Sequence, residues 1–368
     1  MSAPAVSPDF APICAQFAFA GRFVEGRPHG SGHINDTYAV SFDDGGRRVR
    51  YVLQRINSRV FKDVPALMEN VARVCAHTGE RLAKAGVPDA GRRGLSLVPT
   101  VTGAAYWRDA EGGCWRAYHF IEGASTFDKI ESPGQARIAA KAFGEFQRLL
   151  ADLPAPRLRE TIPHFHDTRR RFDTLNRSVR ADAASRVAAA TAEIDFARRR
   201  ENLVDTLLDL QARGAIPERI THNDTKLNNV MLDDVTGEAL CIIDLDTVMP
   251  GLALYDFGDM ARSATNSAEE DEADLSRVRM RLPVFAALVE GYRAGAGSFL
   301  NPAEVANLAL AGRVITFEIG IRFLTDFLDG DIYFKVKRPG HNLDRARNQF
   351  ALLRSMEEQS GAMEELCL

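Results

Sequence analysis

The stretch that decides the fold is Thr221-His-Asn-Asp-Thr-Lys-Leu-Asn-Asn229, which two short apolar segments and a turn connect to Asp244. It offers a carboxylate at Asp224, a cation two residues later at Lys226 and an amide five residues later at Asn229. A second carboxylate, Asp244, directly follows the second apolar segment. Phosphoryl transfer from Mg-ATP uses such a set. One carboxylate orients the attacking hydroxyl, a lysine stabilises the charge of the moving phosphoryl group, and oxygen ligands hold Mg²⁺.

The spacing of these groups matches the catalytic loop of kinases, where an asparagine follows the catalytic aspartate at the same interval and a metal-binding aspartate comes one hairpin later. Apolar residues 230–232 and 240–243 predict the two strands of that hairpin, with Gly237 in the turn between them. Asx-rich loops also cap turns in proteins of every function, so one such residue alone would indicate only a turn. Four groups at kinase spacing on a strand–turn–strand frame favour phosphotransfer.

The same residues carry a family resemblance. Residues 222–229 resemble the loop of the aminoglycoside phosphotransferase and choline kinase-like superfamily. Together with Ile243-Asp-Leu-Asp-Thr-Val-Met-Pro-Gly251 they are similar to the N-acetylhexosamine 1-kinase branch, which phosphorylates the anomeric hydroxyl of GlcNAc and GalNAc. The resemblance extends over about residues 30–334 and implies a two-lobed, protein kinase-like α+β fold with the active site in the cleft.

The resemblance also implies a different role for each of the two lobes. Residues 1–122 are expected to form a small antiparallel β lobe that binds the nucleotide, and residues 123–368 a mostly helical lobe with the catalytic loop and the sugar site. The expected cofactors are ATP and Mg²⁺. Asp224 would orient the anomeric hydroxyl or accept its proton, and Lys226 would stabilise the γ-phosphoryl group. Asn229, with Asp244, would hold the metal.

Nucleotide-binding residues are expected near the N-terminus. Gly30, Ser31 and Gly32 form a Gly-x-Gly turn, and glycines let a backbone approach phosphates closely. An ordinary hairpin turn has the same signature. The position of the turn favours a phosphate-binding loop. The turn joins two predicted strands and precedes residues 50–56, and in kinases the glycine loop and the third strand follow in the same order.

That third strand departs from the kinase pattern, which places a phosphate-binding lysine after an apolar triplet. Gln54 occupies that position in this sequence, and Arg55 points to the opposite face of the strand. Either a bulge redirects Arg55 towards the nucleotide, or Mg²⁺ and backbone amides suffice. Glu69, on a helix predicted over residues 65–84, is the counterpart of the kinase helix glutamate or, with no lysine to pair, a surface charge.

Phe120 and Ile121 lie where the β-rich part of the sequence gives way to helical composition. Kinase-like folds have their hinge at this crossing, and its backbone groups bind adenine. The alternative is an edge strand that runs into a loop. Beyond the crossing, caps and apolar periodicity predict helices at residues 132–152, 274–294, 302–329 and 342–358, and residues 167–213, rich in Ala and Arg, are expected to form a further helical region.

Four further residues are expected at the acceptor site. His33 resembles the histidine of the hexosamine kinase glycine loop, which also borders the sugar. Asp246 lies two residues after Asp244 and is expected to assist the metal or the sugar. Arg322 and Tyr333 fall where those kinases place sugar-contacting residues. The alternative for Arg322 is a structural i, i+4 ladder with Glu318 and Asp326.

Asp256-Phe-Gly258 spells the kinase metal motif in a position that does not suit the metal. It lies 32 residues after Asp224, whereas Asp244 lies 20 residues after it and directly follows a predicted strand. The resemblance to aminoglycoside phosphotransferases, in which a matching aspartate has this role, implies instead that Asp256 fixes the catalytic loop by accepting hydrogen bonds from the backbone or from His222.

Composition excludes several other classes. A formal net charge of −4 argues against non-specific nucleic-acid binding, which requires a basic surface. Five scattered cysteines without paired metal spacing are typical of free thiols in a reducing cytosol. No signal-peptide layout opens the sequence, and no apolar run has the length of a membrane span. We expect a cytoplasmic monomer that binds a small-molecule sugar and neither nucleic acid nor membrane.

Two other functions remain open. A kinase of the same fold could act on another small alcohol, such as another sugar, an aminoglycoside, or a choline- or homoserine-like compound, because fold and loop do not identify the acceptor. A pseudokinase that binds nucleotide without turnover is motivated by the missing lysine. The complete catalytic and metal-binding set argues against it.

Overall fold

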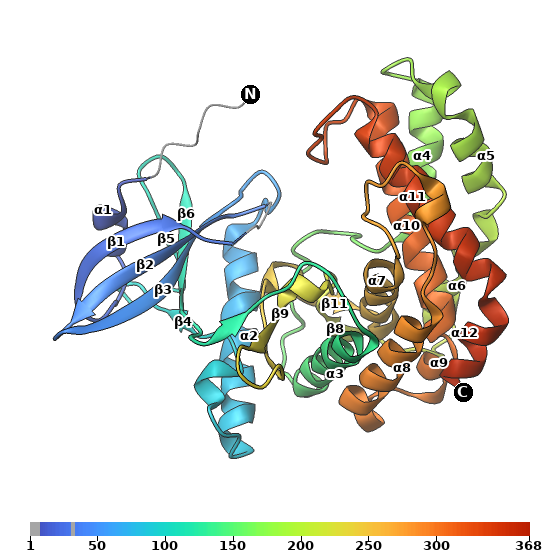
Figure 1. Cartoon of the computed structure of the whole chain (residues 1–368). Coiled ribbons are helices and arrows are strands. Elements are labelled where there is room, and N and C mark those ends of the chain that lie inside the picture. Colours follow the sequence, from blue (N-terminus) through green and yellow to red (C-terminus); the bar gives the residue numbers. More distant parts are fainter. Residues whose placement is uncertain (1–7, 31–33) are drawn as a thin grey trace. The chain divides into compact units, whose positions relative to one another are not determined.

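The computed structural model describes residues 8–30 and 34–368 (Figure 1). The chain divides into two compact units. The first comprises the described residues up to 125 with residues 152–162 and 232–248, and the second comprises residues 126–151, 163–231 and 249–368. A β sheet dominates the first unit and helices the second, which confirms the expected α+β fold. The predicted lobe boundary at residue 122 lies close to 125, and two later segments join the first unit.

Most strands come before residue 126 of the chain, and most helices come after it. The helices are α1 (Phe10–Cys14), α2 (Val64–Lys84), α3 (Pro133–Leu149), α4 (Thr168–Ala181), α5 (Thr191–Arg198), α6 (Thr206–Ala212), α7 (Ala253–Thr265), α8 (Leu282–Ala296), α9 (Pro302–Ala306), α10 (Leu308–Asp329), α11 (His341–Glu358) and α12 (Ser360–Cys367). The strands are β1 (Arg22–Pro28), β2 (Asp36–Asp44), β3 (Arg47–Ile56), β4 (Leu97–Val98), β5 (Trp107–Arg108), β6 (Cys114–His119), β7 (Ala124–Ser125), β8 (Arg219–Thr221), β9 (Val230–Asp233), β10 (Ala239–Ile242) and β11 (Met249–Gly251).

The main sheet of the first unit is antiparallel, in the order β1-β2-β3-β6-β4, with β5 also paired to β6. Alternate residues of its central strands face one core, since successive side chains of a strand point to opposite faces. That core contains Val40, Leu53 and Trp115 from the strands and Phe10 from α1. The opposite face of β3 and β6 carries the polar side chains described below.

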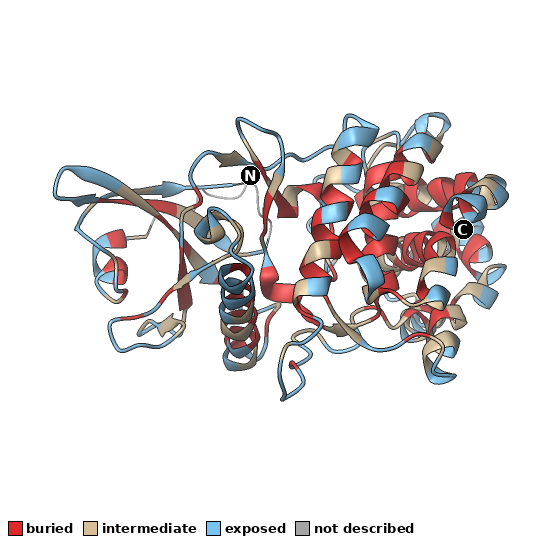
Figure 2. Cartoon of the chain, turned by 90° about the horizontal axis from the view of Figure 1, so that it is seen from below, coloured by how far each residue is buried: buried red, intermediate tan, exposed pale blue. Residues whose placement is uncertain are grey.

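The second unit is organised around α10, which is buried on most of its surface and packs against α4, α7 and α11 (Figure 1). Figure 2 shows in red the many buried residues of the helices in this unit. Two close helix crossings depend on glycine. A Cβ at Gly258 of α7 would lie 2.6 Å from the Ala311 carbonyl oxygen of α10. A Cβ at Gly295 of α8 would lie 2.1 Å from the Lys141 carbonyl oxygen of α3. Any side chain there would therefore separate the helices that support the catalytic loop.

The start of α3 was predicted correctly from its capping residue, whereas apolar periodicity did not predict the bounds of other helices. Ser132 caps α3 by accepting from the backbone N–H of Gln135, as predicted. The helical region predicted at 167–213 contains three helices, α4, α5 and α6: the left-handed residues Asp182 and Ser185 follow α4, and a 3₁₀ turn over Glu201–Leu203 separates α5 from α6. The helix predicted from residue 274 begins only at Leu282, after a loop in which Asn266 pairs with Met280.

All five cysteines are free and buried. Burial raises the pKa of the Cys14 thiol and of the Cys75 thiol to about 12, and that of Cys367 to about 11. Such thiols stay protonated and inert at neutral pH. Across the described part of the chain, no helix is long and apolar enough to cross a lipid bilayer.

Candidate active site

The catalytic loop begins directly after β8, which pairs with β11 in the second unit. Asp256, fully buried at the start of α7, holds the first turn of the loop. Its carboxylate accepts from the backbone N–H of His222 at 2.9 Å and of Asn223 at 2.7 Å. Gln147 of α3 donates its amide to the same carboxylate at 2.5 Å. The predicted structural role of Asp256 is confirmed.

A second anchor lies one turn further along α7. Asp259 accepts from the backbone N–H of Thr225 at 3.0 Å, and Arg262 donates to Asp259 at 2.9 Å. Both charged side chains are buried. The sequence analysis missed this pair, although the spacing of Asp256, Asp259 and Arg262 puts all three on one helix face.

Asp256→Asn is expected to lower the free energy of unfolding by about 1–3 kcal/mol. A carboxamide has one acceptor oxygen, so its NH₂ group would face at least one of the three donors that now meet the carboxylate. Urea denaturation measures the loss. The Mg²⁺ concentration for half-maximal turnover of the folded variant should stay unchanged, and a shift in that concentration would instead assign Asp256 to the metal.

Asp224, Lys226 and Asn229 lie together in the second unit, as their spacing predicts. The Lys226 ammonium is 2.7 Å from Asp224 Oδ1. Asn229 donates its amide NH₂ to the Asp224 carbonyl oxygen at 2.8 Å and to Asp224 Oδ2 at 3.3 Å. The amide oxygen of Asn229 is consequently the atom that suits a metal.

Charge around Asp224 keeps it ionised. Burial raises the pKa of the Asp224 carboxyl, but the charges of Lys226, His222 and Arg262 together lower it by a larger amount. The pKa therefore lies below its ordinary value. The Asp224 carboxylate in turn raises the pKa of Lys226. The loop therefore presents a carboxylate and an ammonium side by side at neutral pH, which suits a base that meets a hydroxyl beside a phosphoryl group.

Asp244 belongs to the first unit and follows β10, as predicted. Its backbone is left-handed, with φ of 61°, and a tight turn over Leu245–Thr247 comes next. Within the described residues no cluster of three His, Cys, Asp or Glu side chains forms a metal cage. Mg²⁺ fits such a sparse set, because it binds one or two protein oxygens together with phosphate oxygens and water. Asp244 in the first unit and Asn229 in the second each carry an oxygen of that kind, and their binding of one metal ion stays a prediction.

Asp246 is almost fully buried in the first unit. Arg116 of β6 donates to its Oδ1, and Asn35 donates to its Oδ2 at 2.6 Å. Both carboxylate oxygens are thus engaged by the protein itself. Its part in binding metal or sugar stays a prediction, and Arg116 and Asn35 are partners that sequence spacing could not indicate.

The side chains at the kinase lysine position point to opposite faces of β3. Gln54 accepts from Arg116 at 2.9 Å and donates to Thr37 at 3.0 Å. The Arg55 guanidinium lies 5.7 Å from the Trp115 ring on the other face. Because β3 pairs continuously with β2 and with β6 around this point, the bulge proposed to redirect Arg55 is wrong.

The structure describes only some of the other residues predicted near the nucleotide. Gly30 has a left-handed φ of 76°, which glycine adopts without strain, and a Cβ there would meet no atom within 4 Å. Ser31, Gly32 and His33 lie outside the described residues. The carboxylate of Glu69 is 3.9 Å from Arg159 on the surface, which supports the surface-charge alternative.

The predicted hinge directly follows an interior strand. β6 lies between β3 and β4, so the edge-strand alternative for this crossing is wrong. The Phe120 ring lies under the Arg50 guanidinium at 3.9 Å, and Ile121 is buried. Arg92 donates to the carbonyl oxygens of Glu122 and Gly123, which fixes the backbone that follows.

Arg322 of α10 does not form the predicted ladder among the described residues. Glu318 bonds His166 at 2.8 Å, and Asp326 accepts from the backbone N–H groups of residues 332–334. The Arg322 guanidinium instead lies 5.1 Å from the Phe165 ring. His166 also lies 3.4 Å from the Asn223 carbonyl oxygen, which links the surroundings of Arg322 to the catalytic loop.

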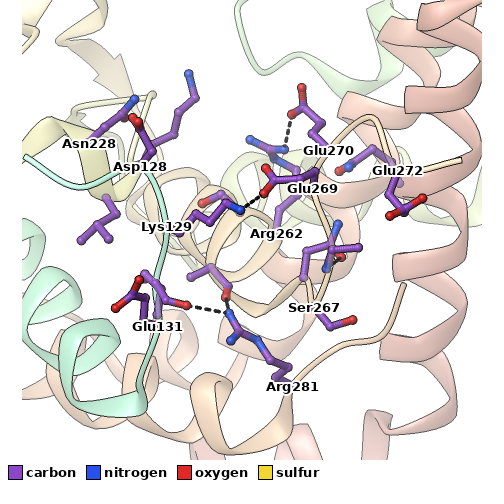
Figure 3. Close-up of a pocket in the computed structure, with 18 of the residues that line it drawn as sticks. Asp128, Lys129, Glu131, Asn228, Arg262, Ser267, Glu269, Glu270, Glu272 and Arg281 are labelled. Carbon is purple, nitrogen blue, oxygen red and sulfur yellow. Dashed lines mark hydrogen bonds and ion pairs between the residues drawn. The ribbon is translucent and has the colours of Figure 1, made fainter. Parts of the chain in front are cut away.

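A cavity of about 390 Å³ in the second unit borders the catalytic loop (Figure 3). Residues 226–228 form part of its wall, and the rest comes from residues 128–131, parts of 262–281 and Gln349. Five cationic and five carboxylate side chains line it, so its formal charge is balanced. The size is typical of small-molecule sites.

Most of the acidic groups in this cavity are already neutralised. The ion pairs, two of them marked in Figure 3, are Lys129–Glu269, Arg262–Glu270 and Arg277–Glu272. Three buried polar atoms of the wall have no hydrogen-bond partner within the described chain: Asn228 Oδ1, Arg281 Nε and Gln349 Oε1. Such atoms are rare in folded proteins, and they offer a ligand two acceptors and one donor.

A sequence profile described as the phosphotransferase enzyme family matches residues 25–297, well over half of the chain. The chain belongs to this family. An aminoglycoside phosphotransferase from Alicyclobacillus acidocaldarius subsp. acidocaldarius DSM 446 shares the fold, with a TM-score of 0.60 at 13% identity over 98% of each chain. A choline kinase from Cryptosporidium parvum Iowa II has a TM-score of 0.57 at 12% identity, over 92% of this chain and 91% of that one.

A spectinomycin phosphotransferase in complex with ADP and spectinomycin is also similar, with a TM-score of 0.53 at 12% identity over 92% of each chain. The chain is thus a member of the phosphotransferase enzyme family, with the fold of aminoglycoside phosphotransferases and choline kinases. The expected superfamily is confirmed at this level.

For this phosphotransferase, Lys226→Met is expected to move the acid limb of kcat to higher pH. The variant removes the strongest influence that lowers the pKa of Asp224, while burial still raises it. In the wild type, the midpoint of the acid limb that comes from Asp224 should lie below pH 3.8, the ordinary pKa of the carboxyl. Lys226→Arg keeps the charge and is the control. An acid limb that stays in place in Lys226→Met would contradict the assignment of Asp224 as base.

Proposed function

We propose that the protein transfers the γ-phosphoryl group of ATP to the anomeric hydroxyl of an N-acetylhexosamine, giving the sugar 1-phosphate. The observation that carries the proposal is the contact of an ionised Asp224 with Lys226 beside the Asn229 amide. When bound, Mg²⁺ neutralises phosphate charge, and Asn229 and Asp244 would hold it.

The acceptor hydroxyl suits the base. Asp224 has a lowered pKa and is therefore a weak base, so it favours the most acidic hydroxyl that the acceptor offers. The anomeric hydroxyl of a sugar is more acidic than its secondary hydroxyls. Asp224 would orient this hydroxyl, and Lys226 would stabilise the phosphoryl group as it moves.

The charge-balanced cavity supports a neutral acceptor. Its carboxylates at Glu269, Glu270 and Glu272 are each paired with a cation, so a ligand amine would have to displace a protein group. Hydroxyl and acetamido groups could instead bond the partnerless atoms of Asn228 and Gln349. An N-acetylhexosamine carries both kinds of group.

Arg322 and Tyr333 are proposed to orient the sugar ring. Tyr333 is largely exposed beside Phe334, and the Arg322 guanidinium lies 5.8 Å from the Phe334 ring. Three contacts connect this group to the cavity wall. Phe334 packs on Phe323, and the Arg345 guanidinium lies over the Phe323 ring. Arg345 in turn pairs with Glu270 of the wall. Aromatic faces next to a fixed donor are a common way to hold a sugar.

The direct test is NMR of the product formed from GlcNAc and ATP. Phosphorus coupling to the anomeric proton is expected, together with loss of the reducing end. A 6-phosphate would keep the reducing end and would refute the 1-kinase assignment while leaving the phosphotransferase family in place.

Arg322→Ala is expected to raise KM for the sugar by roughly 10- to 100-fold, the range of a lost charged hydrogen bond, with KM for ATP almost unchanged. Arg313→Ala, on the same helix but in a surface pair with Glu364, is the control. Steady-state kinetics with each substrate varied in turn measures the split. An equal rise in both KM values would show a general effect on the fold.

The main alternative is a kinase for another small alcohol, including an amino alcohol. Asp128 and Glu131 on the cavity wall favour it, because they could meet a ligand ammonium. An ADP-release assay over free hexosamines, aminoglycosides and choline separates the candidates. Turnover with choline or an aminoglycoside but not with a hexosamine would replace the sugar proposal.

A further inference from the structure

The first unit contains a buried ion pair, Arg116–Asp246, that has no direct role in the proposed phosphotransfer. Arg116, on β6, is 1% exposed and donates to Asp246, which is 2% exposed. Burial lowers the pKa of the arginine, but Asp246 raises it by more, so Arg116 stays positively charged. A buried pair of this kind is often no more stabilising than apolar side chains of the same size. Its presence in a core therefore calls for another reason.

Arg116 supplies the positive charge that Gln54 cannot. The two residues are direct partners in the β3–β6 ladder, and Arg116 Nε donates to Gln54 Oε1 at 2.9 Å. Gln54 stands where the kinase pattern has its lysine. The position is thus occupied by a neutral side chain that holds a guanidinium from the neighbouring strand. On this face of the sheet the cation comes from β6.

Asp246 connects this cation to the turn that carries Asp244. Thr161 donates its hydroxyl to the Asp246 carbonyl oxygen at 2.9 Å, and Asn70 donates to the Val248 carbonyl oxygen at 3.2 Å. With Arg116 on the carboxylate, the turn after β10 is held from three other parts of the unit. Asp244 itself has left-handed backbone, which aspartate adopts more readily than most residues, and the contacts around the turn hold it in that conformation.

The same carboxylate also reaches the end of the predicted phosphate loop. Asn35 donates to Asp246 Oδ2 at 2.6 Å and accepts from the Asn57 backbone N–H at 3.0 Å. Asn35 is the second described residue after the Gly-x-Gly turn. One buried carboxylate thus joins the β6 arginine, the metal-site turn and the base of the phosphate loop.

We propose that Arg116 and Asp246 form a positioning pair that holds Asp244 in the geometry needed to bind the divalent metal of a metal–nucleotide complex. The inference rests on the proposed phosphotransfer function, but not on the identity of the acceptor. In this chain the buried pair stands in for the lysine–glutamate pair of the kinase pattern. Arg116 acts through Asp246 and the turn rather than by touching the metal.

The test measures metal binding without turnover. Mn²⁺ binding in the presence of saturating ADP is followed by electron paramagnetic resonance for wild type and Arg116→Met. The variant is expected to bind Mn²⁺ roughly 10- to 100-fold more weakly, the usual effect of removing a partner that orients a metal ligand. Trp115→Phe is the matched control: it alters the adjacent buried residue on the other face of β6, where the indole N–H bonds Asp109. It should keep wild-type Mn²⁺ affinity.

Two further variants separate positioning from stability. Arg116→Met combined with Asp246→Asn leaves no unpaired charge, so its thermal midpoint should recover relative to Arg116→Met while Mn²⁺ affinity stays weak. Arg116→Lys keeps the charge, but an ammonium cannot serve Gln54 and Asp246 with the fixed fork of a guanidinium, so an intermediate loss is expected. If Arg116→Met does not fold, the Mn²⁺ affinity of Arg116→Lys is compared with the wild type instead.

The outcomes are distinct. Mn²⁺ affinity of the folded Arg116 variants within about twofold of wild type would overturn the positioning role and leave phosphotransfer untouched. An equal loss in Trp115→Phe would also overturn it, because general loosening of the strand would then explain the effect. Wild-type protein that binds neither ADP nor Mn²⁺ would overturn the proposed function and this inference together.

Discussion

Asp224→Asn is expected to lower turnover by roughly 10²- to 10⁴-fold, the usual contribution of a positioned acid–base group. An asparagine fills the same space but cannot accept the proton of the acceptor hydroxyl. It also removes the charge that holds Lys226 at 2.7 Å, so the phosphoryl group loses a well-placed cation as well. Single-turnover kinetics with saturating substrates measures the loss directly.

The fold and the nucleotide site should survive this change. The backbone of the loop is held through the N–H groups of residues 222, 223 and 225, none of which depends on the Asp224 side chain. Circular dichroism and calorimetric ADP binding are therefore expected to match the wild type. Wild-type turnover in Asp224→Asn would refute the base assignment, and a lost ADP site would show that Asp224 acts on the nucleotide.

Asp244→Ala is expected to abolish Mg²⁺-dependent turnover, because the phosphate groups lose the ion that neutralises their charge. Alanine also tolerates the left-handed backbone at this position poorly. Asp244→Asn separates the two effects, since asparagine accepts this conformation and keeps one neutral oxygen. It should fold normally and require far more Mg²⁺ for the remaining turnover.

The matched control lies in the turn of the same hairpin. Asp234 is exposed and belongs to the same unit, so Asp234→Ala changes the charge equally without reaching the turn after β10. It should keep wild-type Mg²⁺ dependence. Unchanged Mg²⁺ dependence in both Asp244 variants would remove Asp244 from the metal site and bring back the aspartates of α7 as candidates.

The parts of the site that the sequence predicted are those fixed by short-range geometry. Asp224, Lys226 and Asn229 lie within one loop, so their spacing nearly determines their contacts. The hairpin to Asp244 was predictable for the same reason, from two short apolar runs on either side of a glycine turn. The distance of Asp256 along the chain argued against a metal role, and the family resemblance implied its structural role.

Partners that are distant in sequence could not be predicted in this way. Arg116 and Asp246 are 130 residues apart, and nothing in the local pattern of β6 marks its arginine as buried. The Arg322 ladder failed for a related reason. The rule for i, i+4 neighbours does not account for His166, which bonds Glu318 from 152 residues away. Tertiary contacts of a buried carboxylate override the weaker attraction along one helix.

The buried cysteines make the protein its own reporter of local opening. Cys14, Cys75, Cys114 and Cys241 lie in the first unit and Cys367 in the second, and alkylating reagents reach a buried thiol only when its surroundings open. Alkylation followed by mass spectrometry can therefore time the native-state fluctuations of each unit separately, in the unmodified protein and without an engineered label.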